Sequence, residues 1–149
     1  MLPHLRDRTL TLKRYPNGVD QAYFYEKQSP SHRAEWVKTQ AVWAEGNQKN
    51  IDFTLCNDLP TLVWLANLAD LELQTNLSRA SDFDAPTMMV YDLDPCPPAT
   101  IVEFFQVGLW IREIVTQFKS QLFAHTSSTK GLHPSTTPPH PTPHHDPPP

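Results

Sequence analysis

The sequence predicts an α+β (mixed α/β) fold, built on a largely antiparallel sheet with flanking helices. Three observations support this class. Segments with the alternation of strands outnumber those with helical spacing, the helical segments occur singly between strands, and 149 residues suffice for one domain with its own core. We expect that domain to span residues 1–132. Residues 133–149 hold half of the chain's 16 prolines and no large apolar residue, which predicts a disordered or polyproline-like tail.

The first 40 residues predict a β-hairpin in a basic stretch, after a short helix end at residues 1–8. Residues 9–15 alternate as a strand does, residues 16–18 have turn chemistry, and residues 21–27 supply an aromatic second strand. Residues 1–40 carry seven Lys and Arg against four Asp and Glu, although the whole chain has a net charge of −4. This basic third suits contact with phosphates, and solvated strand residues would explain the charge equally well.

Two more strands and a helix are predicted next. Residues 35–44 and 51–55 have the composition of strands, and residues 45–47 form the turn between them. Asp58 is suited to cap a helix, because apolar residues recur at helical spacing over residues 62–69. That helix is expected to bury one face.

A pair of carboxylates follows a short apolar run and is the most informative local pattern. After a half-buried strand at residues 71–77 and a polar loop at 81–86, residues 88–91 form an apolar run expected to be a buried strand or a piece of core. Asp92 and Asp94 then lie two positions apart, which in a strand places both side chains on one face. Two adjacent like charges favour a bound cation, which predicts a divalent metal site.

Several chemistries share this pattern. An Asp-X-Asp after an apolar strand occurs in metal-dependent phosphoryl and nucleotidyl transferases, in haloacid-dehalogenase-type phosphatases and in many glycosyltransferases. It also occurs by chance on solvated strand ends. The pattern alone therefore leaves both a metal site and an ordinary strand end open.

The last third predicts one long helix and one strand. Thr100 and Glu103 form a capping box for a helix that runs to about Phe118. Its inward residues are expected to be mostly Ile101, Phe104, Phe105, Leu109, Ile111 and Val115. Residues 122–125 form a last short strand before a polar loop that carries Lys130.

Cysteine content, hydropathy and the tail bear on location and on metal binding. The two cysteines form no CxxC pair and the sequence shows no signal peptide, which predicts a reducing, cytoplasmic location. No apolar run is long enough to span a membrane, so no membrane is expected among the partners. The tail histidines His140, His144 and His145 are expected to be solvated rather than metal ligands.

Six blocks of the sequence, in order and spacing, resemble the polymerase domain of bacterial ligase D. This domain belongs to the archaeo-eukaryotic primase-polymerase family and acts in non-homologous end joining. The blocks are LPHLRDRTLTLKRYPNGV, FYEK, NDLPTLVWLANLADLEL, SRASD, PTMMVYDLDP and TSSTKGLH. The resemblance spans nearly all of residues 2–133 and implies a primase-polymerase fold.

The resemblance also implies roles for individual residues. Asp92 and Asp94 are similar to the catalytic carboxylates that hold divalent cations, Mn²⁺ or Mg²⁺, beside a nucleoside triphosphate. Ser127 and Lys130 are similar to residues that bind the triphosphate, and Gln74 stands where the family usually has a phosphate-directed histidine. DNA contacts are implied for Phe24 and Tyr25, which would stack on the template, and for Lys13 and Arg14, which would touch phosphate. Strand alternation lets at most one of the two aromatic residues face the DNA.

The resemblance implies a DNA-repair nucleotidyltransferase, and the departures from the family pattern qualify it. Cys96 and Ser128 stand where the family usually has glycine, and the family continues after residue 133 with an apolar strand and a third catalytic aspartate. We therefore expect a form truncated at both ends and catalytically impaired, with DNA ends bearing 5′-phosphate and nucleoside triphosphates as partners. A DNA ligase and an end-binding protein are further expected partners. The alternatives are a non-catalytic DNA-end or nucleotide-binding remnant and an unstable product with an incomplete sheet.

Overall fold

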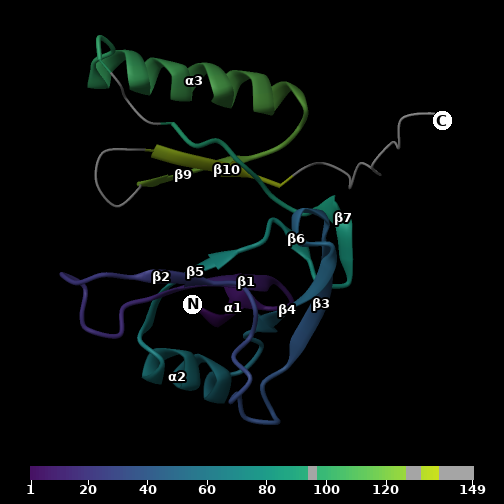
Figure 1. Cartoon of the computed structure of the whole chain (residues 1–149). Helices are drawn as coiled ribbons and strands as arrows, with labels where there is room; N and C mark the ends of the chain where they lie inside the picture. The colour runs from purple at the N-terminus through teal and green to yellow at the C-terminus, as the bar shows by residue number, and fades with distance from the viewer. Residues whose placement is uncertain (94–96, 127–131, 138–149) are drawn as a thin grey trace. The chain divides into compact units, whose positions relative to one another are not determined.

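The computed structural model describes residues 1–93, 97–126 and 132–137, and the chain divides into two compact units. The first unit is Met1–Phe83 and the second is Asp84–Pro149. Each unit is described by itself below. Figure 1 shows both units, coloured by residue number from purple at the N-terminus to yellow near the C-terminus.

The first unit is built around strand β1 (Thr9–Arg14), which pairs along both of its edges. Strand β5 (Asp70–Thr75) follows one edge. The other edge is shared by β4 (Lys49–Leu55), which pairs with Thr9 and Leu10, and by β2 (Phe24–Glu26), which pairs with residues 12–14. Strand β3 (Thr39–Ala44) pairs with β4, and all of these pairs are antiparallel. The predicted hairpin and antiparallel sheet are thus confirmed.

A small apolar core fixes one face of this sheet. Helices α1 (Leu2–Leu5) and α2 (Leu59–Asn67) contribute to it together with β1. The buried cluster consists of Leu5, Leu10, Leu12, Cys56 and Leu65. Figure 1 shows α2 beside the sheet of this unit. The residues of β1 that alternate with Leu10 and Leu12 therefore point to the opposite face.

Local chemistry explains where α2 begins. The Asp58 carboxylate accepts a hydrogen bond from the Thr61 backbone N–H at 2.8 Å, and Pro60 occupies the first turn, where its missing N–H costs nothing. The predicted cap is confirmed. The 3₁₀ turn η1 (Glu45–Asn47) joins β3 to β4, as the turn predicted there requires.

The second unit contains a three-stranded antiparallel sheet and one long helix. The sheet order is β8 (Met89–Val90), β10 (Leu132–Thr136), β9 (Leu122–Thr126). Helix α3 (Ile101–Gln117) begins at the predicted capping box, in which Glu103 Oε2 accepts from the Thr100 backbone N–H at 2.5 Å. Strand β6 (Ser78–Arg79), which belongs to the first unit, and β7 (Asp82–Pro86), which begins there, form a two-stranded sheet, so the prediction of a loop over residues 81–86 is wrong.

Strand β10 corrects the expectation that the folded part ends at residue 132. Pro134, Ser135 and Thr136 are buried, although the tail was expected to contribute nothing to a core. The backbone explains how a proline fits a central strand. The Pro134 carbonyl oxygen faces β8 and accepts from the Tyr91 N–H at 2.9 Å, so its missing N–H also faces β8, while the pairing with β9 continues through Ala124.

The same proline explains why β8 is short. Val90 pairs with Ser135, so the next residue, Tyr91, lies opposite Pro134. The Tyr91 N–H donates to the Pro134 carbonyl oxygen, but Pro134 has no N–H to donate to Tyr91 in return. The strand therefore ends at Val90. Met89 and Val90 are 47% and 37% exposed, so the prediction of a buried strand over residues 88–91 is wrong.

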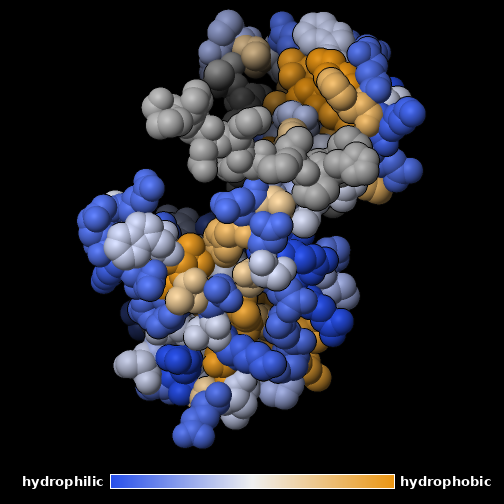
Figure 2. All heavy atoms as spheres, turned by 90° about the vertical axis from the view of Figure 1, so that its right-hand side faces the viewer, coloured by the Kyte–Doolittle hydropathy of each residue, from blue (hydrophilic) through white to orange (hydrophobic). Residues whose placement is uncertain are grey.

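Helix α3 also buries less than predicted. Of the six residues expected to point inward, Phe104 and Val115 are buried, whereas Ile101, Phe105 and Leu109 are exposed. Figure 2 shows apolar side chains gathered on the surface of this unit. In the part of the chain that the structure describes, no helix combines the length and apolar character needed to cross a membrane.

Candidate functional site

The face of the first sheet opposite the apolar core collects three of the predicted site residues. Lys13 on β1 lies opposite Tyr25 on β2 and opposite Glu72 on β5, and Thr11 lies opposite Gln74. Directly opposed residues in antiparallel strands share a face, and so do residues two apart in one strand. Lys13, Tyr25 and Gln74 therefore point to the same side. We call this side, with Tyr15, Tyr23 and Glu72, the tyrosine face.

Lys13 lies at the centre of the tyrosine face. Its Nζ atom is 4.2 Å from the ring centroid of Tyr23, 5.2 Å from that of Tyr15 and 6.0 Å from that of Tyr25. The ring faces attract the ammonium group, because their π electrons carry partial negative charge. The rings also contact one another, with centroids 5.6 Å apart for Tyr15 and Tyr23 and 5.8 Å for Tyr23 and Tyr25.

The Lys13 ammonium group is held by a carboxylate as well as by rings. Nζ donates to Glu72 Oε1 at 2.7 Å, and the Tyr15 hydroxyl donates to the same oxygen. The hydrogen bond to Glu72 is the main cause that raises the pKa of Lys13. The same bond is the main cause that lowers the pKa of Glu72. Both groups are therefore charged at neutral pH.

Arg14 and Phe24 lie on the other side of the same hairpin. They oppose each other across β1 and β2, with the guanidinium carbon 5.3 Å from the ring centroid. Arg14 donates to Glu26 at 3.0 Å and to the Leu68 carbonyl oxygen at 3.0 Å. The four predicted DNA-binding residues thus lie on two faces of the hairpin. Lys13 and Tyr25 share one face, and Arg14 and Phe24 share the other.

The predicted stacking residues are both accessible, because β2 is an edge strand. Phe24 is 44% exposed and Tyr25 is 53% exposed, on opposite faces. Gln74 is exposed on β5, next to the tyrosine face. The roles of these residues toward DNA and nucleotide stay predictions.

The predicted carboxylate site belongs to the second unit. Asp92 is exposed and follows β8 rather than lying within it, so the alternation of a strand does not fix the direction of its side chain. The chain after Val90 runs antiparallel to β10, toward Leu132, which pairs with Thr126 at the end of β9. Asp92 thus approaches the end of the sheet formed by Thr126 and Leu132. Asp94, Ser127 and Lys130 lie outside the described residues.

The donor chemistry of this segment fits a hard divalent cation. Carboxylate oxygens are the ligands that Mg²⁺ and Mn²⁺ prefer, and Asp92 presents an exposed carboxylate. Among the described residues there is no cluster of three or more His, Cys, Asp or Glu that could hold a metal. A cation site formed by Asp92 with Asp94 stays a prediction from the sequence.

Three members of the tyrosine face were not predicted as site residues. Tyr15, Tyr23 and Glu72 each contact Lys13. The alternation of residues 71–77 did predict that Glu72 and Gln74 share a face. The sequence held no signal for the pairing with Lys13, because Glu72 lies 59 positions further along the chain.

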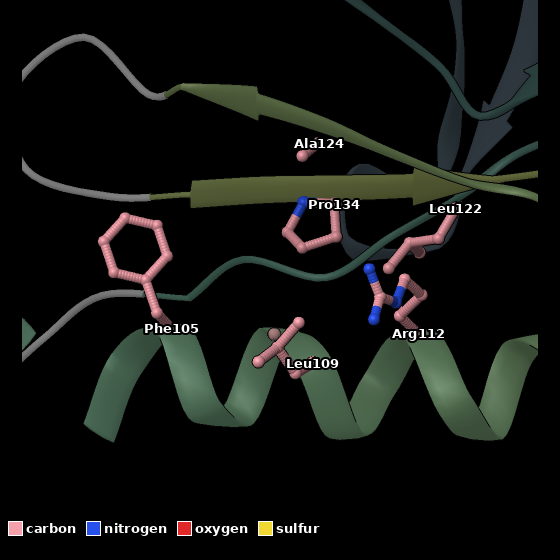
Figure 3. A pocket seen from close by; sticks show the side chains of 7 residues that line it. Phe105, Leu109, Arg112, Leu122, Ala124 and Pro134 are labelled. Carbon is pink, nitrogen blue, oxygen red and sulfur yellow. The ribbon is translucent and has the colours of Figure 1, made fainter. Parts of the chain in front are cut away.

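A hollow lies within the second unit, between α3 and the sheet. It has a volume of about 370 Å³ and is mainly apolar, with Phe105, Leu109, Leu122, Ala124 and Pro134 among its lining residues. Figure 3 shows the side chains of α3 and those of the strands converging from opposite sides, with Arg112 as the charged member. None of the predicted site residues lines it.

Comparisons with known proteins agree on one family. The sequence model of the family described as "LigD, primase-polymerase domain" matches residues 1–144. The multifunctional non-homologous end joining protein LigD of Mycolicibacterium smegmatis is 31% identical over 135 residues, which are 89% of this chain and 18% of that protein. The bifunctional non-homologous end joining protein LigD of Bacillus subtilis is 29% identical over 136 residues, covering 89% and 20%.

A solved structure is similar over nearly the whole chain. It is the polymerase domain from Mycobacterium tuberculosis ligase D in complex with DNA, with a TM-score of 0.86 and 30% sequence identity. The match covers 95% of this chain and 51% of that one. The chain therefore spans about half of the solved domain and about a fifth of the curated relatives.

Proposed function

We propose that this chain, which belongs to the LigD primase-polymerase domain family, binds DNA ends through the tyrosine face and serves DNA end joining as a nucleotidyltransferase unit. The observation that carries the proposal is the placement of Lys13, Tyr25 and Gln74 on one face of the sheet. The solved relative was obtained in complex with DNA, which supports DNA as the partner.

The chemistry of the tyrosine face suits an unpaired DNA strand. Stacking of a base on an aromatic ring contributes about 1–3 kcal/mol per base, and it tolerates any base because each one has a π face. Tyr25 is half exposed and so offers a ring to a base, while Lys13 supplies a cation for the adjoining phosphate. Gln74 offers an amide that donates hydrogen bonds to phosphate oxygens without carrying charge.

The proposed reaction is the transfer of a nucleotide to a 3′ hydroxyl, with the impaired catalysis that the departures from the family pattern predict. Asp92 and Asp94 would hold the divalent cations, Mn²⁺ or Mg²⁺, and bound cations of this kind activate the attacking oxygen and neutralise phosphate charge. Ser127 and Lys130 would contact the triphosphate through a hydroxyl and a positive charge. A DNA ligase and an end-binding protein are the proposed partners of the repair reaction.

The DNA-binding part is tested by fluorescence anisotropy with a 5′-phosphorylated duplex that has a 3′ overhang. We expect Tyr25→Ala and Lys13→Met each to weaken binding several-fold. The control is Trp36→Ala, which removes an exposed ring beside α2, away from the tyrosine face. Equal losses in all three variants, or no binding by the wild type, would refute the proposal.

The metal site is tested separately from activity. Mn²⁺ binding, followed by the loss of the free Mn²⁺ signal in electron paramagnetic resonance, is expected to weaken at least tenfold in Asp92→Asn. The control is Asp20→Asn, which removes an exposed carboxylate in the first unit. Unchanged Mn²⁺ affinity in Asp92→Asn would remove Asp92 from the site.

A further inference from the structure

The tyrosine face contains an anion, the Glu72 carboxylate, next to the cation that the proposed function assigns to DNA phosphate. Glu72 Oε1 lies 2.7 Å from Lys13 Nζ, which is the distance of a charge-assisted hydrogen bond. The Tyr15 hydroxyl donates to the same oxygen. Glu72 thus takes up two donors that are oriented toward a single anionic oxygen.

The two partners of this ion pair differ in how firmly they are held. The Lys13 side chain is 14% exposed and packed among three rings, whereas the Glu72 side chain is 48% exposed. Breaking the pair therefore costs little on the side of Glu72, since water can solvate its carboxylate. Lys13 would stay among the rings with its ammonium group available to another anion.

We propose that Glu72 is a built-in competitor of nucleic-acid phosphate, which occupies Lys13 until a DNA strand on the tyrosine face displaces it. This inference rests on the proposed function and assigns a role to a residue outside it. Glu72 acts through Lys13 and is a positioning residue rather than a catalytic one. It lowers the affinity for any phosphate that does not also bring a base to stack on the rings.

The experiment measures affinity of the full chain for the same overhang DNA at several salt concentrations. Glu72→Gln keeps the size of the side chain and an acceptor for the Tyr15 hydroxyl, but removes the charge that holds Lys13. We expect binding to tighten about two- to fivefold, the range expected for a partly exposed ion pair. Glu72→Ala should give a similar gain, and circular dichroism checks that both variants fold.

A double-mutant cycle separates this role from a general effect of charge. In a Lys13→Met background the Glu72→Gln change should add nothing beyond the gain seen in Glu45→Gln, a control that removes a carboxylate from η1. Lys13→Met alone should also reduce the slope of log affinity against log salt by about 0.7–0.9, the loss of one phosphate contact.

The outcomes distinguish the two proposals. If the wild type binds DNA and Glu72→Gln binds no tighter, or more weakly, Glu72 supports the tyrosine face instead of competing, and this inference is wrong. A gain in the Lys13→Met background that exceeds the gain of the Glu45→Gln control would overturn it as well. If the wild type binds no DNA, the proposed function fails and this inference fails with it.

Discussion

At the scale of single residues, the Asp70 carboxyl group is buried in surroundings that disfavour its ionised form. Both of its oxygens are buried and accept no hydrogen bond from the residues that the structure describes. Burial raises its pKa to about 7 from 3.8, and the Arg14 guanidinium, 3.6 Å away, opposes that rise only in part. The folded state therefore binds a proton more tightly than the unfolded state does. The contribution of protonated Asp70 to the free energy of unfolding is fully present below pH 3.8 and is lost as the pH rises toward and through 7.

This linkage predicts a pH-dependent effect of Asp70→Asn. The variant cannot ionise, so its unfolding free energy relative to the wild type should rise between pH 5 and pH 8 by roughly 1–3 kcal/mol. Urea unfolding at both pH values measures the difference. The exposed Asp20→Asn is the control and should follow the wild type. A constant difference between Asp70→Asn and the wild type would mean that Asp70 is ionised in the fold at both pH values.

Single residues also show how far sequence reasoning reaches. Strand alternation predicted that Phe24 and Tyr25 face opposite sides, and the structure confirms it. Alternation fixes only the face on which a side chain lies, because it depends on neighbours along the chain. The partner of Lys13 comes from β5, and that pairing depends on a long-range register that local patterns do not contain.

At the scale of elements, the start of α2 gives a direct test of local chemistry. Asp58→Ala removes the acceptor for the Thr61 N–H and should lower the free energy of unfolding by about 1 kcal/mol. Asp58→Asn keeps an acceptor and should cost much less. Chemical denaturation of both variants measures this difference. Equal losses would show that the charge of Asp58, rather than its hydrogen bond, stabilises the helix.

Elements with strong local signals were predicted, and those shaped by tertiary pairing were not. The Asp58 cap located α2, the Thr100–Glu103 capping box located α3, and strand-like segments located β1 and β9 from the sequence. Strand β10 was missed because the prolines of residues 133–149 predict a structureless tail. Strand β10 can form because the side of Pro134 that lacks an N–H faces the short strand β8, so its pairing with β9 is not interrupted. That compensation depends on which neighbour faces the proline, which no local pattern specifies.

At the scale of the whole molecule, the two units differ in how much apolar surface they bury. The first unit has a contiguous core with Leu10, Leu12, Cys56 and Leu65 at 1% exposure or less. In the described part of the second unit, the large apolar residues that are buried are Phe104 and Val115. Helix α3 instead exposes Ile101, Val102, Phe105, Val107, Leu109, Trp110 and Ile114. Because local stability follows buried apolar contacts, we expect the units to differ in stability.

Hydrogen exchange followed by mass spectrometry measures this difference directly. Peptides from β1, β4 and β5 should exchange more slowly than peptides from α3, because opening the first sheet exposes its core. Leu10→Ala should destabilise the first unit by about 2–5 kcal/mol and speed exchange most in those three strands. Val63→Ala, at an exposed position of α2, is the control. Protection of α3 as strong as that of β1 in the wild type would show that the exposed apolar side of α3 is covered in solution.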